Sequence, residues 1–312
     1  MRGPSNRWLP GAVAALLLAQ PGPARSEPGC WQLVAHSTVG REVSNALFVD
    51  ERTGFAAHCV VGAAHGALLR TEDRGSTWTA AGVDSVCLFG LEATRTEAWC
   101  TGDRGDVHRS ADGGRTWTRA DPSGRAVATH ADWLSFVDAG RGAAASHSDV
   151  RVTEDGGSTW SPVRLPEHID SVGGVSLSPS SEGTGTVLRL FNPAGTMWAS
   201  RDAGATWTVV PTPLRRPLFE WGDGVHAVLR FPSAREGILV AMVEEDEGPR
   251  GRVYRTVDGG QTWTEEQVEG GLWPSPVAIS SDGELITSLD RGAIRLYRRT
   301  RGPVDQPPAP VP

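Results

Sequence analysis

The sequence predicts an all-β fold from three observations. An eight-residue pattern occurs five times, as "TEDRGSTW" (71–78), "SADGGRTW" (110–117), "TEDGGSTW" (153–160), "SRDAGATW" (200–207) and "TVDGGQTW" (256–263). The intervals between its tryptophans are 39, 43, 47 and 56 residues. Short apolar runs separated by turn residues surround every copy, and no segment shows helical periodicity. Four-stranded repeats of this length are typical of the blades of a β-propeller.

The position of the pattern within each repeat follows from its neighbours. An extended segment such as "GALLR" or "GRVYR" comes just before it, and another such as "TWTAAG" comes just after it. Two further apolar runs lie upstream, for example "NALFVD" and "GFAAH". We therefore expect the pattern to form the turn between the third and fourth strands of each blade.

Each letter of the pattern has a structural explanation. An aspartate accepts hydrogen bonds from turn N–H groups, a glycine supplies positive φ, and a hydroxyl ties the start of the turn to its end. A tryptophan opens the fourth strand and buries its ring where two blades meet. These roles predict a structural, non-catalytic function for Asp73, Trp78, Asp112, Trp117, Asp155, Trp160, Asp202, Trp207, Asp258 and Trp263.

The common pattern, [ST]-x-D-x-G-x-[ST]-W, resembles the Asp box, also called the bacterial neuraminidase repeat. The surrounding blade pattern covers nearly all of the chain after residue 26. The resemblance implies a β-propeller of the kind found in sialidases, sortilin ectodomains and photosystem II stability/assembly-factor-like proteins. Among these groups, the chain most resembles the photosystem II stability/assembly-factor-like propellers. It also implies that the turns lie at the outer edge of the blades, away from the ligand-binding face.

The number of blades is predicted from a sixth, incomplete repeat. Residues 275–299 match the first three strands of the other repeats but lack a following "TW". The segment "GCWQLVA" (29–35) resembles a fourth strand, with Trp31 in the tryptophan position. We therefore expect six four-stranded blades, with the last closed by the N-terminal strand around Trp31, because closure removes unpaired sheet edges. The alternative is seven blades, with one hidden in the long interval 208–255.

Three segments are predicted along the chain. Residues 1–26 read as a signal peptide, with Ala24 and Ser26 before the cleavage site, residues 27–300 as the propeller, and the proline-rich residues 301–312 as a disordered tail. The mature chain is therefore expected to be an exported monomer, periplasmic or extracellular, with no integral membrane segment. A lipoprotein acylated at Cys30 is the less favoured alternative.

Four cysteines, Cys30, Cys59, Cys87 and Cys100, follow the predicted cleavage site. An even number in an exported chain favours disulfides over buried free thiols. Cys87 and Cys100 fall on neighbouring strands and are one candidate pair, and Cys59–Cys87 is the competing pair. No metal site is predicted, because no cysteine or histidine spacing suits one, and no cofactor is predicted.

Composition excludes some functions. The net charge is −7, and all 30 basic residues are arginines spread along the chain. A nucleic-acid partner is therefore not expected, since binding needs a concentrated basic face. The absence of lysine excludes Schiff-base chemistry and phosphate-binding P-loops.

Candidate ligand-binding residues lie on the long loops that leave the fourth strands. Exposed arginine and tryptophan are typical binding anchors, although these aromatics could instead cover the channel mouth. The candidates are Arg215, Arg216, Trp221, Trp273, His130 and His168.

The favoured function is a non-catalytic scaffold that binds a protein or a glycan through its loop face. The alternative is a sialidase-like glycoside hydrolase with divergent catalytic residues. The only two tyrosines, Tyr254 and Tyr297, fall on third strands and not on the channel wall, which disfavours a sialidase. A hydrolase would have a carboxylate-lined pocket with shifted pKa values at the channel mouth, whereas a scaffold would have a broad, shallow face.

Overall fold

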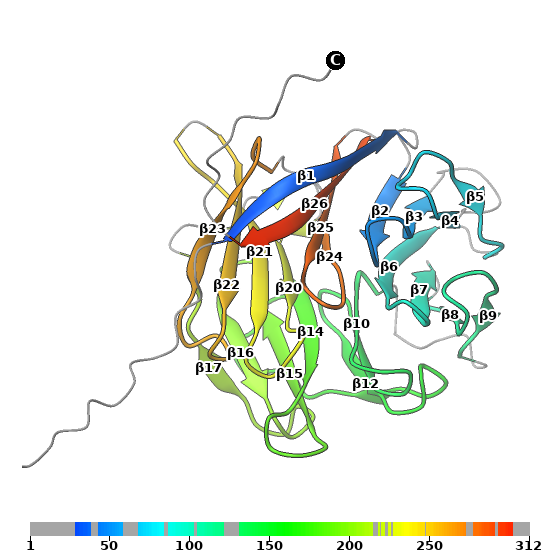
Figure 1. Cartoon of the computed structure of the whole chain (residues 1–312). Helices are drawn as coiled ribbons and strands as arrows, with labels where there is room; N and C mark the ends of the chain where they lie inside the picture. The colour runs from blue at the N-terminus through cyan, green and yellow to red at the C-terminus, as the bar shows by residue number, and fades with distance from the viewer. Residues whose placement is uncertain are drawn as a thin grey trace, which may run out of the picture.

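The computed structural model describes residues 29–38, 43–58, 68–83, 87–102, 105–121, 131–214, 218, 220–221, 224–225, 227–246, 248–272, 277–290 and 293–301. Every regular element in these ranges is a β-strand. The strands form four-stranded units placed side by side around a ring (Figure 1). The predicted all-β propeller class is therefore confirmed.

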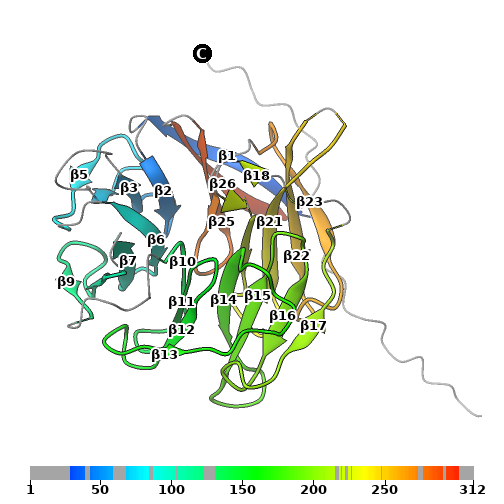
Figure 2. The same cartoon turned by 180° about the vertical axis from the view of Figure 1, so that it is seen from behind.

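Each unit is an antiparallel sheet, and its four strands are ordered from the middle of the ring to its rim (Figures 1 and 2). The first strands are β2 (Val43–Phe48), β6 (Leu88–Ala93), β10 (Trp133–Phe136), β14 (Gly174–Pro179), β20 (Ala227–Arg230) and β24 (Val277–Ile279). The second strands are β3 (Gly54–His58), β7 (Ala98–Gly102), β11 (Gly142–Ala145), β15 (Thr186–Phe191), β21 (Gly237–Val243) and β25 (Leu285–Asp290). The third strands are β4 (Leu68–Thr71), β8 (Val107–Ser110), β12 (Val150–Thr153), β16 (Met197–Ser200), β22 (Arg250–Thr256) and β26 (Ala293–Arg301). The outer strands are β5 (Thr79–Ala80), β9 (Thr118–Arg119), β13 (Ser161–Pro162), β17 (Thr208–Val210), β23 (Thr264–Val268) and β1 (Gly29–Thr38).

The described residues contain six such units. The first strands of successive units contact each other in order, and β2 contacts β24, so the ring is closed. In the long interval 208–255, where a seventh blade was the alternative, the described residues between β17 and β20 form one short extra hairpin of β18 (Glu220–Trp221) and β19 (Gly224–Val225). Buried apolar clusters fill the spaces between neighbouring units.

The N-terminal strand closes the last unit, as predicted. β1 pairs antiparallel with β26 along its length and parallel with β23, which joins the last two units into one eight-stranded sheet (Figure 1). Trp31 is fully buried, and its Nε1 donates to Glu266 Oε2 at 2.9 Å. Arg299 forms an ion pair with Glu266 Oε1 at 2.6 Å. Trp31 therefore bonds to a carboxylate of the preceding unit, whereas Trp78, in the first of the repeated turns, donates to a glycine carbonyl.

The five repeated turns share one hydrogen-bond network, which the first turn illustrates. Asp73 Oδ1 accepts from the hydroxyl of Thr71 and the N–H of Thr77, both at 2.8 Å, and Asp73 Oδ2 accepts from the Thr77 hydroxyl at 2.7 Å. The Thr71 hydroxyl in turn accepts from Gly75 N–H at 2.9 Å. The same carboxylate and hydroxyl bonds recur around Asp112, Asp155, Asp202 and Asp258. All five carboxylates are thus engaged in the hydrogen bonds of their own turns.

The glycine of each turn lies against the preceding unit. Gly114 has φ of 81°, and a Cβ placed there would lie 2.2 Å from Phe55 of the first unit. Phe55 also meets Trp117 edge-on, with ring centroids 6.2 Å apart. Gly204 has φ of 92°, and its Cβ would lie 2.4 Å from Val163 of the third unit. Glycine is thus required both for the left-handed backbone and for the close approach of two units, and Trp117 packs at the junction of the first two units.

Arginine side chains also bridge neighbouring units. Arg70 Nε donates to Gly113 O at 2.9 Å, and Arg141 Nη1 donates to Thr184 O at 2.6 Å. Arg298 pairs with Glu51 across the junction of the last and first units at 2.5 Å. The planar guanidinium presents several donors in a fixed fork, so one side chain can reach a carbonyl of the next sheet.

The cysteines correct one prediction. Cys30 and Cys100 are free, buried thiols, and burial raises the pKa of Cys100. The Cys87–Cys100 pairing is therefore wrong, although the two strands are neighbours. Cys100 lies on β7 with its side chain inside the apolar cluster between the first two units. Cys59 lies outside the described residues, so its pairing with Cys87 stays a prediction.

The turn glycines predict a sharp difference between two substitutions. Gly82→Ala places a methyl group in open space at φ of 72° and costs about 1–2 kcal/mol of folding free energy from the left-handed backbone alone. Gly114→Ala adds the collision with Phe55 and costs about 1–3 kcal/mol more. Urea unfolding of both variants measures the difference. Equal losses would show that the close approach of the units contributes nothing.

The turn aspartates predict loss of stability in acid. Hydrogen bonds from Thr206 lower the pKa of Asp202 to about 2, below the unfolded value of about 3.9. Its contribution is therefore present above pH of about 4 and is lost as the pH falls towards 2. Asp202→Asn should lower the urea midpoint at pH 7 and weaken its decline between pH 4 and 2. Asp170→Asn, on an exposed loop, is the charge-matched control and should leave both unchanged.

Candidate functional site

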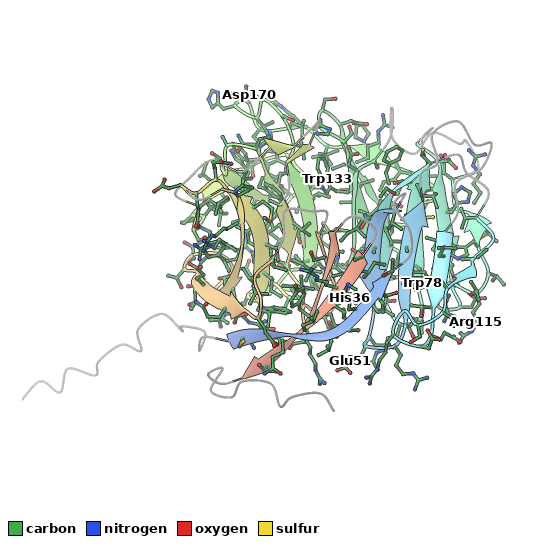
Figure 3. The ribbon with its side chains drawn as sticks, turned by 90° about the horizontal axis from the view of Figure 1, so that it is seen from above. His36, Glu51, Trp78, Arg115, Trp133 and Asp170 are labelled. Atoms are coloured by element: carbon green, nitrogen blue, oxygen red, sulfur yellow. The ribbon has the colours of Figure 1, made fainter. Side chains whose placement is uncertain are left out.

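The ring has two distinct faces. We call the end with the hairpins between first and second strands and the repeated turns the turn face. We call the end with the loops between second and third strands and the loops leaving the outer strands the loop face. Figure 3 separates them: Trp133 and Asp170 lie towards the upper side, and Glu51, Trp78 and Arg115 lie towards the lower side. The repeated turns are therefore remote from the loop face.

The sequence-predicted binding residues are mostly untested. Arg215, Arg216, Trp273 and His130 lie outside the described residues, and of Trp221 only the backbone, in β18, is described. His168 is exposed in the loop that joins the third and fourth units. These six residues stay predictions.

The structure brings together three loop-face residues of the third unit, which we call the mouth cluster: Asp132, Trp133 and His147. The rings of Trp133 and His147 meet at 62° with centroids 5.2 Å apart. His147 Nδ1 lies 3.4 Å from Asp132 Oδ2, and the His147 side chain is 44% exposed. Val172 N–H donates to His147 O at 2.8 Å, which attaches the following loop to the cluster.

The mouth cluster borders a small central cavity. Asp132 and Trp133 line it together with residues from the first strands of all six units, and its volume is about 60 Å³. By volume such a cavity has room for about two water molecules. This cavity is too small for a sugar ring.

A buried ion pair crosses the cavity. Glu92 Oε2 pairs with Arg230 Nη1, and their side chains are 5% and 7% exposed. They come from the second and fifth units, which stand opposite each other in the ring. Burial raises the pKa of Glu92, and the neighbouring Arg230 opposes the shift. Within the described part of the chain, Glu92 Oε1 and Arg230 Nε have no hydrogen-bond partner.

The arrangement at the channel favours binding over hydrolysis. Glycoside hydrolysis needs two carboxyl groups flanking a bound sugar. Two carboxyl groups line the central cavity, Glu92 and Asp132, but Glu92, whose pKa is raised by burial, is enclosed and paired with Arg230. Across the described residues no group of three or more histidine, cysteine, aspartate or glutamate side chains could hold a metal ion.

Sequence reasoning missed the mouth cluster and the Glu92–Arg230 pair. A signal for the pair was present, because Glu92 and Arg230 interrupt the apolar runs "CLFGLEA" and "AVLRF" of two first strands. A charge within a predicted inner strand calls for a partner. Nothing in the local sequence indicated which residue, 138 positions away, supplies it.

Comparisons with known proteins show the class of fold. No family model matches the chain. A stretch of 154 residues, 45% of the chain, is 21% identical to vacuolar protein sorting/targeting protein 10 of Talaromyces marneffei and spans only 9% of that protein.

Among solved structures, the chain is similar to a protein of unknown function from Dyadobacter fermentans, with a TM-score of 0.55, 14% identity, and coverage of 86% of this chain and 99% of the other. The chain is also similar to the structure of YCF48 bound to a D1 peptide, with a TM-score of 0.50, 16% identity, and coverage of 90% of this chain and 99% of the other. For the GH74 xyloglucanase of Xanthomonas campestris the TM-score is 0.51 and the identity 17%, with coverage of 84% of this chain and 46% of the other. At these identities the similarity shows a shared β-propeller fold and nothing about activity.

The described residues contain no helix of the length and apolar character needed to span a membrane.

The Glu92–Arg230 pair predicts strong coupling between opposite units. Glu92→Met leaves a buried arginine without a partner and should lower the free energy of unfolding by about 3–5 kcal/mol. The double variant Glu92→Met/Arg230→Met should recover most of this loss, since it removes both charges. Urea unfolding of the two single variants and the double variant measures the coupling. If the double variant lost as much free energy of unfolding as the two single variants together, the predicted coupling would be wrong.

Proposed function

We propose that the protein is a non-catalytic β-propeller scaffold that binds a protein segment through its loop face. The observation that carries this proposal is the closed centre of the ring. A channel with a cavity of about 60 Å³, crossed by Glu92 and Arg230, offers no substrate pocket. The half-buried ring of Trp133 and the exposed imidazole of His147 then stand at its mouth.

The mouth cluster suits a peptide partner. Trp133 presents an apolar ring beside the imidazole of His147 and the carboxylate of Asp132, so apolar contact and hydrogen bonding lie side by side. Interface anchors combine these properties. The fold shared with YCF48, whose structure holds a D1 peptide, supports the choice of a protein segment over a small molecule.

We further propose that the five repeated turns are Asp boxes. The same carboxylate, hydroxyl and glycine contacts at all five positions support this. The boxes stabilise the ring from the turn face and leave the loop face free for a partner.

A disulfide between Cys59 and Cys87 is also proposed. Cys30 and Cys100 are free, and Cys87 is disulfide-bonded, which supports Cys59 as its partner. Mass mapping of the unreduced protein should detect one linked peptide pair containing both residues. Alkylation of Cys59 and Cys87 in the unreduced protein would contradict the proposed disulfide. Export, which this bond would require, stays a prediction because residues 1–26 lie beyond the described ranges.

Peptide binding is testable by selection from a displayed library on the full chain. We expect binders whose affinity falls at least tenfold in Trp133→Ala, since loss of a central aromatic anchor costs about 1.4 kcal/mol or more. Arg115→Ala, at an exposed position on the turn face, is the matched control and should leave the affinity unchanged. Binders that depend on Arg115 and are indifferent to Trp133 would contradict a loop-face site.

A further inference from the structure

Two adjoining cavities lie on the outer flank of the fifth unit, away from the loop-face site. The first, of about 510 Å³, is bordered by the loop after β17 and by strands β21, β22 and β23. The second, of about 720 Å³, follows β22 and β23 towards Leu272. Both include Arg252 and Glu265, so the two cavities are continuous. Both volumes fall within the roughly 300–1,000 Å³ of typical ligand sites. We call the first cavity the flank cleft.

The charged side chains in and beside the flank cleft form ion pairs with one another. Arg252 donates to Glu245 Oε1 through Nε at 2.9 Å and to Glu265 Oε1 through Nη1 at 2.7 Å. Arg250 Nε lies 3.7 Å from Glu245 Oε2. Two carboxylates thus face two guanidinium groups. Counted together with Arg250, which lines the adjoining cavity, these four side chains carry no net charge, and they hold several planar polar groups in fixed orientations.

Two aromatic side chains complete the wall. Trp263 Nε1 donates to Pro211 O and Gly260 O, both at 3.1 Å, which fixes the orientation of the indole ring. Tyr254 is half-buried on β22, and no described residue bonds to its hydroxyl. The amide of Gln261 also lines the cleft. The cleft therefore combines fixed aromatic surface with unused hydrogen-bonding groups.

We propose that the flank cleft binds a short, neutral oligosaccharide. Aromatic faces pack against the C–H surface of a sugar ring, and planar carboxylate, guanidinium and amide groups hydrogen-bond to its hydroxyls. An ionic ligand would have to break the Glu245–Arg252–Glu265 pairs, whereas a neutral polyol leaves them intact. The cleft shares no residue with the mouth cluster and does not depend on the proposed peptide site.

The test uses the full chain with cellotetraose, maltotetraose and N-acetylchitotetraose as probes, followed by tryptophan fluorescence and saturation-transfer NMR. We expect at least one probe to bind with submillimolar Kd. Tyr254→Ala should weaken that binding at least tenfold, and the isosteric Tyr254→Phe should weaken it about threefold through loss of the hydroxyl. Tyr297→Phe is the matched control, since Tyr297 occupies β26, the third strand of the last unit, is buried, and lines neither cavity.

The loop-face variant Trp133→Ala separates this proposal from the peptide site. Sugar binding should survive Trp133→Ala, and peptide binding should survive Tyr254→Phe. The two proposals can therefore be disproved independently of each other. Binding of none of the three tetrasaccharides would overturn the proposal, as would sugar binding that is lost in Trp133→Ala and kept in Tyr254→Ala. Displacement by the synthetic proline-rich peptide GPVDQPPAPVP, with no response to any sugar, would assign the cleft to a peptide and also overturn it.

Discussion

The ring depends on the contact between each repeated turn and the sheet before it. A turn glycine with positive φ brings its backbone against a side chain of the preceding unit, as Gly114 does with Phe55. A side chain at this position would push the units apart. The aspartate network holds the turn in the required shape, because the Asp112 carboxylate bonds to the hydroxyls of Ser110 and Thr116 across the turn. Local hydrogen bonds therefore set the spacing between whole sheets.

The last unit lacks such a turn, and its contact with the preceding unit is built differently. β1 enters from the other end of the chain and pairs with both β26 and β23. The Trp31 indole and the Arg299 guanidinium both bond to Glu266, whose side chain is fully buried. A buried carboxylate is costly unless its oxygens are satisfied, and here two donors satisfy it. The junction that joins the ends of the chain thus relies on a polar network where the others rely on glycine packing.

Charged side chains also decide where the molecule can bind a partner. Glu92 and Arg230 occupy the centre of the ring, so the channel is closed to ligands of sugar size. We therefore place recognition outside this cavity in our proposals, at the mouth cluster and in the flank cleft. In the cleft Arg252 is paired with both Glu245 and Glu265, and Arg250 of the adjoining cavity lies beside Glu245, so the aromatic side chains are the main apolar contact surface. The two proposed sites differ in chemistry, since the mouth cluster joins an indole to an imidazole and a carboxylate, whereas the flank cleft joins aromatic rings to paired charges.

The sequence alone determined the fold, the repeated turns and the closing strand. These features depend on residues close together in the chain: Asp73, Gly75 and Thr77 bond within one turn, and the alternation of apolar runs marks the strands. The tertiary structure decided what depends on contacts between distant residues. Cys87 and Cys100 lie on neighbouring strands, yet Cys100 remains a free thiol within an apolar cluster. Glu92 meets Arg230, and Trp133 meets His147, only because ring closure and strand register place them together. Local hydrogen bonding can be read from spacing, whereas the partner of a buried charge is set by the closure of the whole ring.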